Sequence, residues 1–305
     1  MDFDMDQILA ADAVLIAGPT ASGKSALALD LADRLAAAGR EPVIVNTDSM
    51  QVYSSLRVLS ARPDDADMAR CAHRLYGHIV PRIAYSTGRW LAEAVDLLAD
   101  LRLRGQFPVF AGGTGLYFKA LTEGLAPIPE IPDEIRQKYR DRLSESGAET
   151  LPGELAMRDP EAAAAIEPAD AQRIVRALEV LEATGQSIRV WQSGQNVDPA
   201  LPAEHVVRYA VLPERALLYA RIEERFDTMV EAGALEEVKA LMGLGLDPEL
   251  PAMKAIGVRE LSEVLGGGLA LEAAIEQAKT RTRQYAKRQM TWMRNQMDDW
   301  TRIEP

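Results

Sequence analysis

A glycine-rich loop that ends in a lysine and a serine is the clearest chemical motif in the sequence. It fits the pattern G-x-x-x-x-G-K-[ST], follows an apolar run at 13–17 and opens a helical pattern at Lys24. Its backbone N–H groups and the helix N-terminus favour an anion, Lys24 adds a full positive charge, and the Ser25 hydroxyl can bind Mg²⁺. The motif predicts a diphosphate or triphosphate site; the alternative is a glycine-rich turn without a ligand. Its members are Gly18, Pro19, Thr20, Ala21, Ser22, Gly23, Lys24 and Ser25.

Two further polar residues follow other predicted strands. Asp48 comes after the strand expected at 43–46, and Thr114 follows the paired glycines that end the strand expected at 108–111. Because the carboxyl ends of parallel strands form one ligand crevice, we expect both residues to face the phosphate loop. A carboxylate there can hold Mg²⁺ through water or accept a proton from a nucleophile, unless it only caps a turn at 49–53. The glycines before Thr114 allow close backbone approach, unless they serve packing alone.

Short apolar strands alternate with longer amphipathic helices in the elements that must position these residues. Strands are expected at 13–17, 43–46, 76–80, 108–111 and 206–212, and helices at 24–38 and 88–103. The alternation predicts an α/β fold, a P-loop NTPase-like parallel sheet core with helices on both faces. A helical C-terminal region follows, with helices expected at 214–232, 234–243, 257–265 and 271–295. A separate C-terminal domain is also compatible with this pattern.

A proline-rich segment at 126–134 interrupts the alternation. It contains three prolines, and the alanine-rich sequence that follows, to about residue 195, has no strand pattern. The simplest account is a helical insertion domain at 126–204 within a core domain formed by 1–125 and 205–305.

Composition limits the classes of protein that the chain can belong to. It has 305 residues, of which 48% are hydrophobic, so it can bury a core and is not a disordered protein. The one cysteine excludes a disulfide framework and a cysteine-rich zinc site. The sequence has no apolar run of about 18 residues, so no membrane span is expected. The N-terminal stretch is acidic and lacks a signal-peptide pattern, so we expect a cytoplasmic protein.

Positive charge is concentrated near the end of an acidic chain. A net charge of −12 argues against a nucleic-acid partner, but residues 279–294 contain six basic residues and no acidic one. A helix of this kind can neutralise nucleic-acid phosphates. The six are Lys279, Arg281, Arg283, Lys287, Arg288 and Arg294.

Taken together, the motifs resemble those of the tRNA dimethylallyltransferases, also called tRNA isopentenyltransferases, of bacterial type. The matching segments run in order over about 10–300: GPTASGKS at 18–25, DSMQVY at 48–53, YSTGRW at 85–90, GGTGLYFKAL at 112–121, DAQRIVRALEVLEATG at 170–185, RIEERFDTM at 221–229, PAMKAIGVREL at 251–261 and TRQYAKRQMTWMRN at 282–295. The resemblance implies a P-loop kinase-like core with a helical insertion, and a monomer. It implies transfer of a dimethylallyl group from dimethylallyl diphosphate to the exocyclic amine of the adenosine 3′ of the anticodon, in tRNAs that read codons beginning with U. The loop would then hold this diphosphate rather than ATP.

The resemblance also implies roles for individual residues. Asp48 matches the aspartate that hydrogen-bonds the amine and acts as the base, and Thr114 matches a threonine near the reacting centre. An arginine in the RIEERF segment binds diphosphate in the family. Arg221 and Arg225 are both candidates, and the alternative for each is a surface ion pair with Glu224 or its neighbours.

Mg²⁺ is the expected cofactor, held by Ser25 and, through water, by Asp48. The tRNA anticodon stem-loop is the expected partner, and a solvated charged helix face is the alternative for residues 172–176. The residues expected to contact tRNA are Asp48, Ser49, Met50, Gln51, Thr114, Arg136, Gln172, Arg173, Ile174, Val175, Arg176, Arg283, Lys287, Arg288 and Arg294.

Some positions depart from the family pattern. Arg62 stands where lysine is usual and Ser60 where threonine is usual, and arginine differs from lysine in geometry. Three other functions remain open: a small-molecule P-loop kinase, an adenylate isopentenyltransferase that acts on free AMP, and a non-enzymatic RNA-binding protein. The kinase predicts ATP turnover and gives the basic segment no role. The adenylate enzyme does not need an insertion and a basic helix, and an RNA-binding protein does not need Lys24 or Asp48.

Overall fold

The computed structural model describes residues 3–147, 149–193 and 198–304. The chain forms two compact units, one made of 1–122 with 200–305 and the other of 123–199. Each is described by itself. The domain limits expected at 126–204 stay a prediction, because compactness does not show that a unit folds independently. Among the described residues, no helix has the length and apolar character needed to cross a membrane.

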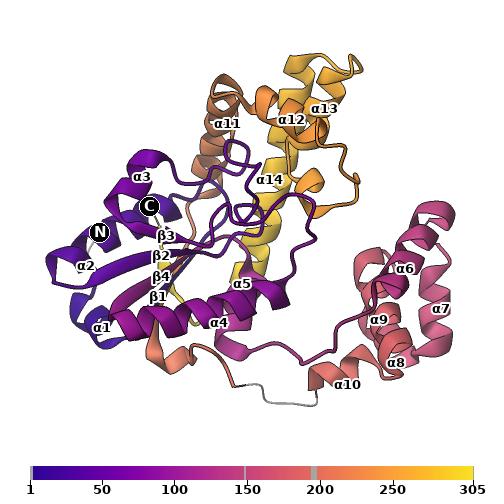
Figure 1. The fold of residues 1–305 in the computed structure, drawn as a ribbon, viewed down its shortest axis with the longest axis horizontal. Helices are drawn as coiled ribbons and strands as arrows, with labels where there is room; N and C mark the ends of the chain where they lie inside the picture. Colours follow the sequence, from indigo (N-terminus) through magenta and orange to yellow (C-terminus); the bar gives the residue numbers. More distant parts are fainter. Residues whose placement is uncertain (1–2, 148, 194–197, 305) are drawn as a thin grey trace. The chain divides into compact units, whose positions relative to one another are not determined.

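A six-stranded parallel sheet forms the centre of the first unit (Figure 1). Its order is β3-β2-β4-β1-β5-β6, and the phosphate loop follows the inner strand β1. This confirms the predicted α/β fold. The strands are β1 (Ala13–Ala17), β2 (Glu41–Asn46), β3 (Ala72–Arg74), β4 (Gln106–Gly112), β5 (Val206–Val211) and β6 (Thr301–Ile303).

The strand expected at 76–80 is wrong. β3 ends at Arg74, because Leu75 and Gly77 take positive φ angles of 61° and 58°, which extended strands do not allow. Ile79 forms only an isolated bridge with Tyr53. The three-residue edge strand β6 was not predicted, since its sequence is too short to show alternation.

Helices cover both faces of the sheet, as predicted. Ala13, Leu15 and Ala17 of β1 pack with α4, α5 and the end of α14. Val14 and Ile16 point the other way and pack with α1 and α2. The helices of the first half of this unit are α1 (Met5–Ala10), α2 (Lys24–Ala37), α3 (Asp65–Arg70), α4 (Thr87–Arg104) and α5 (Gly115–Glu123).

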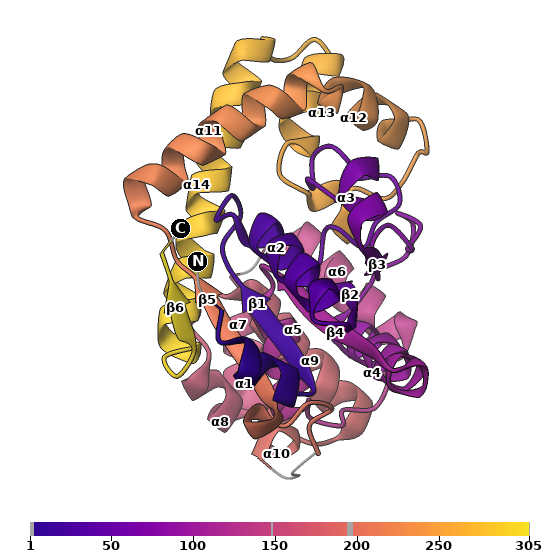
Figure 2. The same ribbon diagram turned by 90° about the vertical axis from the view of Figure 1, so that its left-hand side faces the viewer.

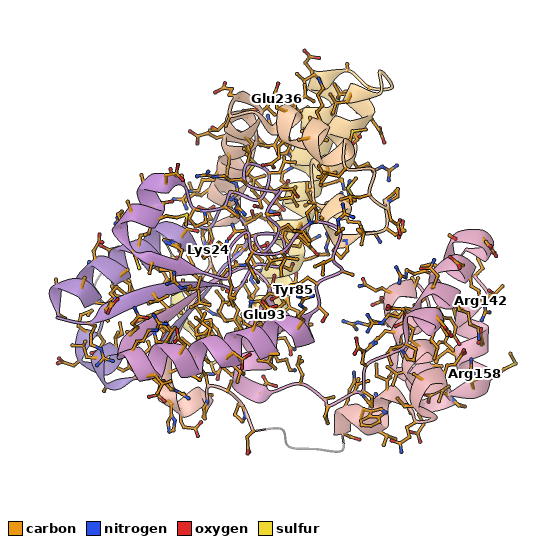
Figure 3. The ribbon with its side chains drawn as sticks, viewed as in Figure 1. Lys24, Tyr85, Glu93, Arg142, Arg158 and Glu236 are labelled. Atoms are coloured by element: carbon orange, nitrogen blue, oxygen red, sulfur yellow. The ribbon has the colours of Figure 1, made fainter. Side chains whose placement is uncertain are left out.

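The family segment at 85–90 starts α4. Ser86 caps the helix by accepting a hydrogen bond from the N–H of Arg89 at 3.2 Å. The hydroxyl of Tyr85 donates to Glu93 at 2.6 Å, and Figure 3 shows these two side chains together. The segment therefore stabilises the helix that supports one face of the sheet.

The C-terminal helices belong to the same compact unit as the sheet. Val52, Tyr53 and Leu56, which follow β2, share a core with them. Leu218 and Ile222 of α11 pack against α14, and Figure 2 shows these helices side by side. They are α11 (Arg215–Glu231), α12 (Ala234–Met242), α13 (Val258–Leu265) and α14 (Leu271–Gln296), with 3₁₀ turns at Ala203–His205 and Pro251–Lys254.

The second unit is helical throughout its described residues, as predicted for this part of the chain. Tyr139 lies in its core and donates from its hydroxyl to Glu182 at 2.7 Å. Arg142 and Arg158, labelled in Figure 3, both pair with Glu154. The helices are α6 (Asp133–Ser146), α7 (Leu151–Arg158), α8 (Pro160–Ala165), α9 (Ala171–Thr184) and α10 (Ile188–Ser193).

Candidate active site

The phosphate loop wraps the turn between β1 and α2. The N–H of Gly18 donates to the carbonyl of Gly112 at 3.1 Å, which fixes the start of the loop on the neighbouring strand. Gly23, at φ 90°, allows the left-handed turn into α2. The hydroxyl of Ser22 is buried and has no hydrogen-bond partner among the described residues. A buried polar atom without a partner inside such a loop favours a ligand that supplies one.

Lys24 is a buried cation at the first turn of α2, at the end of β1 where Figure 3 labels it. Only 9% of the residue is exposed, and its Nζ donates to the carbonyl of Pro19 at 3.2 Å. Burial lowers the pKa of Lys24 to about 8; the charge of Asp48 opposes this shift and that of Arg225 adds to it. Within the described residues Lys24 forms no ion pair, so a bound anion would stabilise its charge.

Both candidate arginines of α11 reach the phosphate loop. Arg225 donates from Nη2 to the hydroxyl of Thr20, and Arg221 donates from Nη1 to the carbonyl of Ser22 at 3.5 Å. They are four residues apart and therefore share one helix face. Burial lowers the pKa of Arg225, and the charge of Asp48 partly offsets this effect. In the described part of the chain neither arginine pairs with an acidic residue, so the alternative of an ion pair with Glu224 is wrong.

Asp48 and Thr114 meet at the same edge of the sheet. The hydroxyl of Thr114 accepts from the N–H of Ser49 at 3.0 Å. Asp48 is half-buried, and its Oδ1 accepts from the N–H of Met50 at 2.9 Å. Its Oδ2 has no hydrogen-bond donor among the described residues. The carboxylate is therefore held in one orientation with one oxygen available.

Three tyrosines lie close enough to Asp48 for its charge to affect their pKa values. Burial raises the pKa of Tyr76, Tyr117 and Tyr285, and the charge of Asp48 raises each further. The ring of Tyr117 stacks on Trp90, with 4.1 Å between centroids. The three phenols therefore stay neutral beside the proposed base.

Gly113 lies where three segments meet. A Cβ on this residue would lie 2.4 Å from Nε2 of Gln289, 3.2 Å from the carbonyl oxygen of Gly18 and 3.5 Å from Oδ2 of Asp48. Only glycine fits this position without displacing one of them. Sequence reasoning missed Gln289. The sequence feature that could have identified Gln289 is a polar residue among the core positions Ala286, Met290 and Met293 of one helix.

The segments after Asp48 are ordered by their own side chains. Gln51 donates from Nε2 to the carbonyls of Ser60 and Ala61 at 2.8 and 3.0 Å. Arg62 donates to the carbonyl of Tyr53 at 3.2 Å and also covers Gly77. The guanidinium of Arg62 thus stabilises a turn, whereas Ser49 and Met50 are half-buried beside Asp48.

The six basic residues of α14 divide into two groups. Lys279 pairs with Asp227, Arg281 with Glu260, and Arg283 with Glu223 at 2.8 Å. Acidic residues distant in the sequence therefore neutralise three of the six charges, and the tRNA contact expected of Arg283 stays a prediction. The other three are exposed and form no ion pair among the described residues, and they are Lys287, Arg288 and Arg294.

Trp292 is half-buried and packs against the start of α5. A Cβ on Gly115 would lie 2.1 Å from the indole ring, so the ring covers the start of α5.

In the second unit, α9 presents only part of its predicted tRNA contacts. Gln172 and Arg173 are exposed, and Arg176 is half-buried at 3.5 Å from Glu179. Ile174 and Val175 are buried in the core of the unit, and the tRNA contact expected at these two positions stays a prediction.

Arg136, on α6, has its Nε buried without a hydrogen-bond partner in the described part of the chain. Arg136, Arg140 and Arg176 all lie close enough to Glu179 to stabilise its charge, against the burial that raises its pKa. Three arginines therefore lie near one half-buried carboxylate.

Comparisons with known proteins agree with this site. The family model "IPP transferase" matches residues 51–296, and the model "Isopentenyl transferase" matches 11–82. The chain is 56% identical over 298 residues to the tRNA dimethylallyltransferase of Agrobacterium fabrum, covering 96% of this chain and 97% of the relative. It is 56% identical over 297 residues to the enzyme of the same name from Rhizobium meliloti, covering 96% and 95%.

Solved structures give the same result. The full-length tRNA isopentenylpyrophosphate transferase of Bacillus halodurans is 33% identical, with a TM-score of 0.67 over 96% of this chain and 90% of that one. A eukaryotic dimethylallyltransferase studied acting on tRNA is 29% identical, with a TM-score of 0.76 over 92% and 69%. These findings confirm the resemblance read from the motifs. The chain belongs to the IPP transferase family, that of the tRNA dimethylallyltransferases.

Proposed function

We propose that this protein transfers the dimethylallyl group of dimethylallyl diphosphate to the exocyclic amine of the adenosine 3′ of the anticodon, in tRNAs reading codons that begin with U. One observation carries the proposal. The buried Lys24 and the half-buried Arg225 pair with no carboxylate in the described residues. Both reach the phosphate loop, and both are close enough to Asp48, which keeps one oxygen available, for its charge to affect their pKa values. The names of the relatives favour this reaction over a small-molecule kinase.

The phosphate loop acts on the leaving group. Its backbone N–H groups with Lys24, Arg221 and Arg225 would neutralise the diphosphate as the bond between its oxygen and the allylic carbon breaks. The diphosphate leaves with the bonding electron pair. Because these groups are fixed before the donor binds, they stabilise charge as it develops without reorganising.

The residues present fit a magnesium ion. Ser25 is exposed at the start of α2 and Asp48 is half-buried after the end of β2, and both offer oxygen ligands, which Mg²⁺ prefers. No group of three or more metal-binding side chains exists among the described residues, which suits an ion held mainly by the diphosphate and water. Bound there, the ion would supply further positive charge to the leaving group.

Asp48 acts on the acceptor. A new bond forms between the adenine nitrogen and the allylic carbon, and the nitrogen must lose a proton. Oδ2 of Asp48 is the acceptor for this proton, since Oδ1 is already bonded to the N–H of Met50. The hydroxyl of Thr114 holds the same segment in place through Ser49.

The RNA contacts come from both units. The unpaired cations Lys287, Arg288 and Arg294 would bind tRNA phosphates, and Arg136, Gln172, Arg173 and Arg176 are side chains of the helical unit that can do so. The adenine must leave the stack of the anticodon loop to reach Asp48, which costs less in an unpaired loop than in a duplex. We propose that the protein acts as a cytoplasmic monomer.

In the test, the purified protein and Mg²⁺ are given labelled dimethylallyl diphosphate together with unmodified tRNA or with free AMP. A separate reaction contains ATP and small metabolites as possible phosphate acceptors. Label in tRNA alone supports the proposal. Label in AMP would assign the protein to the adenylate enzymes, and hydrolysis of ATP without label transfer would favour a kinase.

A further inference from the structure

Gln289 of α14 is a buried polar residue that bridges two loops of the proposed site. Only 6% of the residue is exposed. Its Oε1 accepts a hydrogen bond from the N–H of Thr20 at 2.9 Å, and its Nε2 donates to the carbonyl of Gly113 at 2.9 Å. Thr20 belongs to the loop that would hold the donor, and Gly113 precedes Thr114. One side chain therefore joins the donor side of the site to the acceptor side.

The helix that carries Gln289 is itself firmly anchored. Ala286 and Met290 pack against Leu218 and Ile222 of α11, and Met293 lies in the core below the sheet. Trp292 covers Gly115 one turn after Gln289. Because α14 is packed on both sides of Gln289, the two hydrogen bonds fix the loops against a rigid support.

The chemistry of the bridge requires an amide. Gln289 presents an acceptor to one backbone N–H and a donor to one backbone carbonyl, and both groups lie in a single plane. Glutamate lacks the donor, and methionine lacks both groups at nearly the same length. Both partners are backbone atoms, so the bridge does not use the side chain of Thr20, and it needs the glycine at 113 because a Cβ there would lie 2.4 Å from Nε2 of Gln289.

We propose that Gln289 is a positioning residue that sets the distance and orientation of the phosphate loop relative to Asp48 and Thr114. The inference rests on the proposed function. Transfer needs the allylic carbon between the leaving diphosphate and the incoming amine, and a displacement of about 1 Å can lower the rate about 100-fold. The helix proposed to bind tRNA through its exposed cations thereby also joins the two halves of the active site.

The experiment compares Gln289→Met and Gln289→Glu with Gln284→Met, a control at an exposed glutamine of the same helix. The rate of transfer to tRNA, the KM values for tRNA and donor, and the products of the consumed donor are measured. We expect both Gln289 variants to lower kcat about tenfold or more, with a KM for tRNA within about twofold of the wild-type value. A larger fraction of the donor should appear as dimethylallyl alcohol, formed when water in place of the amine bonds to the carbon and releases its proton to solvent.

A second measurement separates positioning from folding. Donor-binding sites are counted for each variant, and kcat is expressed per site. The proposal is overturned if kcat per site stays within about twofold of wild type, or if hydrolysis and transfer fall in the same proportion. If the wild-type protein transfers no label to tRNA, the proposed function fails and this inference fails with it. If the wild type transfers label and Gln289→Met transfers it equally well, only the inference is overturned.

Discussion

Thr114 holds both residues that flank Asp48. Its hydroxyl accepts from the N–H of Ser49 at 3.0 Å, and its own N–H donates to the carbonyl of Thr47 at 3.0 Å. The segment that carries the proposed base is therefore clamped from the end of β4. The arrangement gives Thr114 a role in the site that does not depend on any direct contact with substrate.

Replacing Thr114 with valine should remove the acceptor for the Ser49 N–H while keeping the shape and the backbone bond. An unsatisfied donor of this kind costs about 1–3 kcal/mol, and we expect kcat to fall about tenfold as Asp48 becomes less ordered. Thr114→Ser, which keeps the hydroxyl, is the matched control. Steady-state kinetics and denaturant unfolding measure both effects. Equal kcat values for the valine and serine variants would contradict the clamp.

Asp48→Asn should abolish most turnover without changing tRNA binding. The asparagine oxygen can still accept from the Met50 N–H, so the turn is kept, but the amide cannot take a proton. Loss of a general base lowers rates by about 10²–10⁴, and we expect kcat to fall in this range. Single-turnover transfer and tRNA binding by filter retention measure the two properties. A rate near that of wild type would remove Asp48 from the mechanism.

Donor affinity should depend on pH through Lys24. In the free protein the pKa of Lys24 is lowered to about 8, and burial is the largest cause of this shift. The negative charge of a bound diphosphate must raise this pKa. Binding therefore takes up a proton above pH 8. We expect the affinity to be level with respect to Lys24 below pH 8, and to weaken as pH rises from about 8 toward the higher pKa of the complex, by up to about tenfold per pH unit.

The control for this prediction is Lys24→Met, titrated with the same diphosphate over the same pH range. It should bind the donor more weakly and lose the inflection near pH 8, while keeping any dependence that comes from the ligand itself. An inflection that persists in Lys24→Met would assign the pH dependence to another group.

The exposed cations of α14 should determine the salt dependence of tRNA binding. Neutralising Lys287, Arg288 and Arg294 to glutamine should reduce the slope of log affinity against log salt by about 1 for each phosphate that a cation no longer neutralises. Arg283→Gln should have a smaller effect, because Arg283 is paired with Glu223. Arg102→Gln, at the exposed end of α4, is the control. An unchanged slope in the triple variant would place the RNA elsewhere.

The local motif of the phosphate loop could be predicted because its information is contiguous. β1 has the predicted bounds, and Lys24 begins α2 as the glycine-lysine pattern requires. The strand expected at 76–80 failed because the backbone angles at Leu75 and Gly77 decide where β3 ends, and apolar pattern does not encode them.

Long-range pairing was the part that could not be predicted. Nothing near Arg283 indicates that Glu223, sixty residues earlier, neutralises it. The spacing of Arg221 and Arg225 predicts a shared helix face, but not that both arginines reach the same loop. Gln289 contacts residues 269 and 176 positions away, and only the packing of α14 brings them together.

The most direct test of the account is to digest the tRNA after reaction with dimethylallyl diphosphate and to identify the modified nucleoside and its position by mass spectrometry. The account predicts a single dimethylallyl group on the exocyclic amine of the adenosine 3′ of the anticodon, formed by the wild type and not by Asp48→Asn. A modification elsewhere in the tRNA, or equal modification by Asp48→Asn, would contradict it.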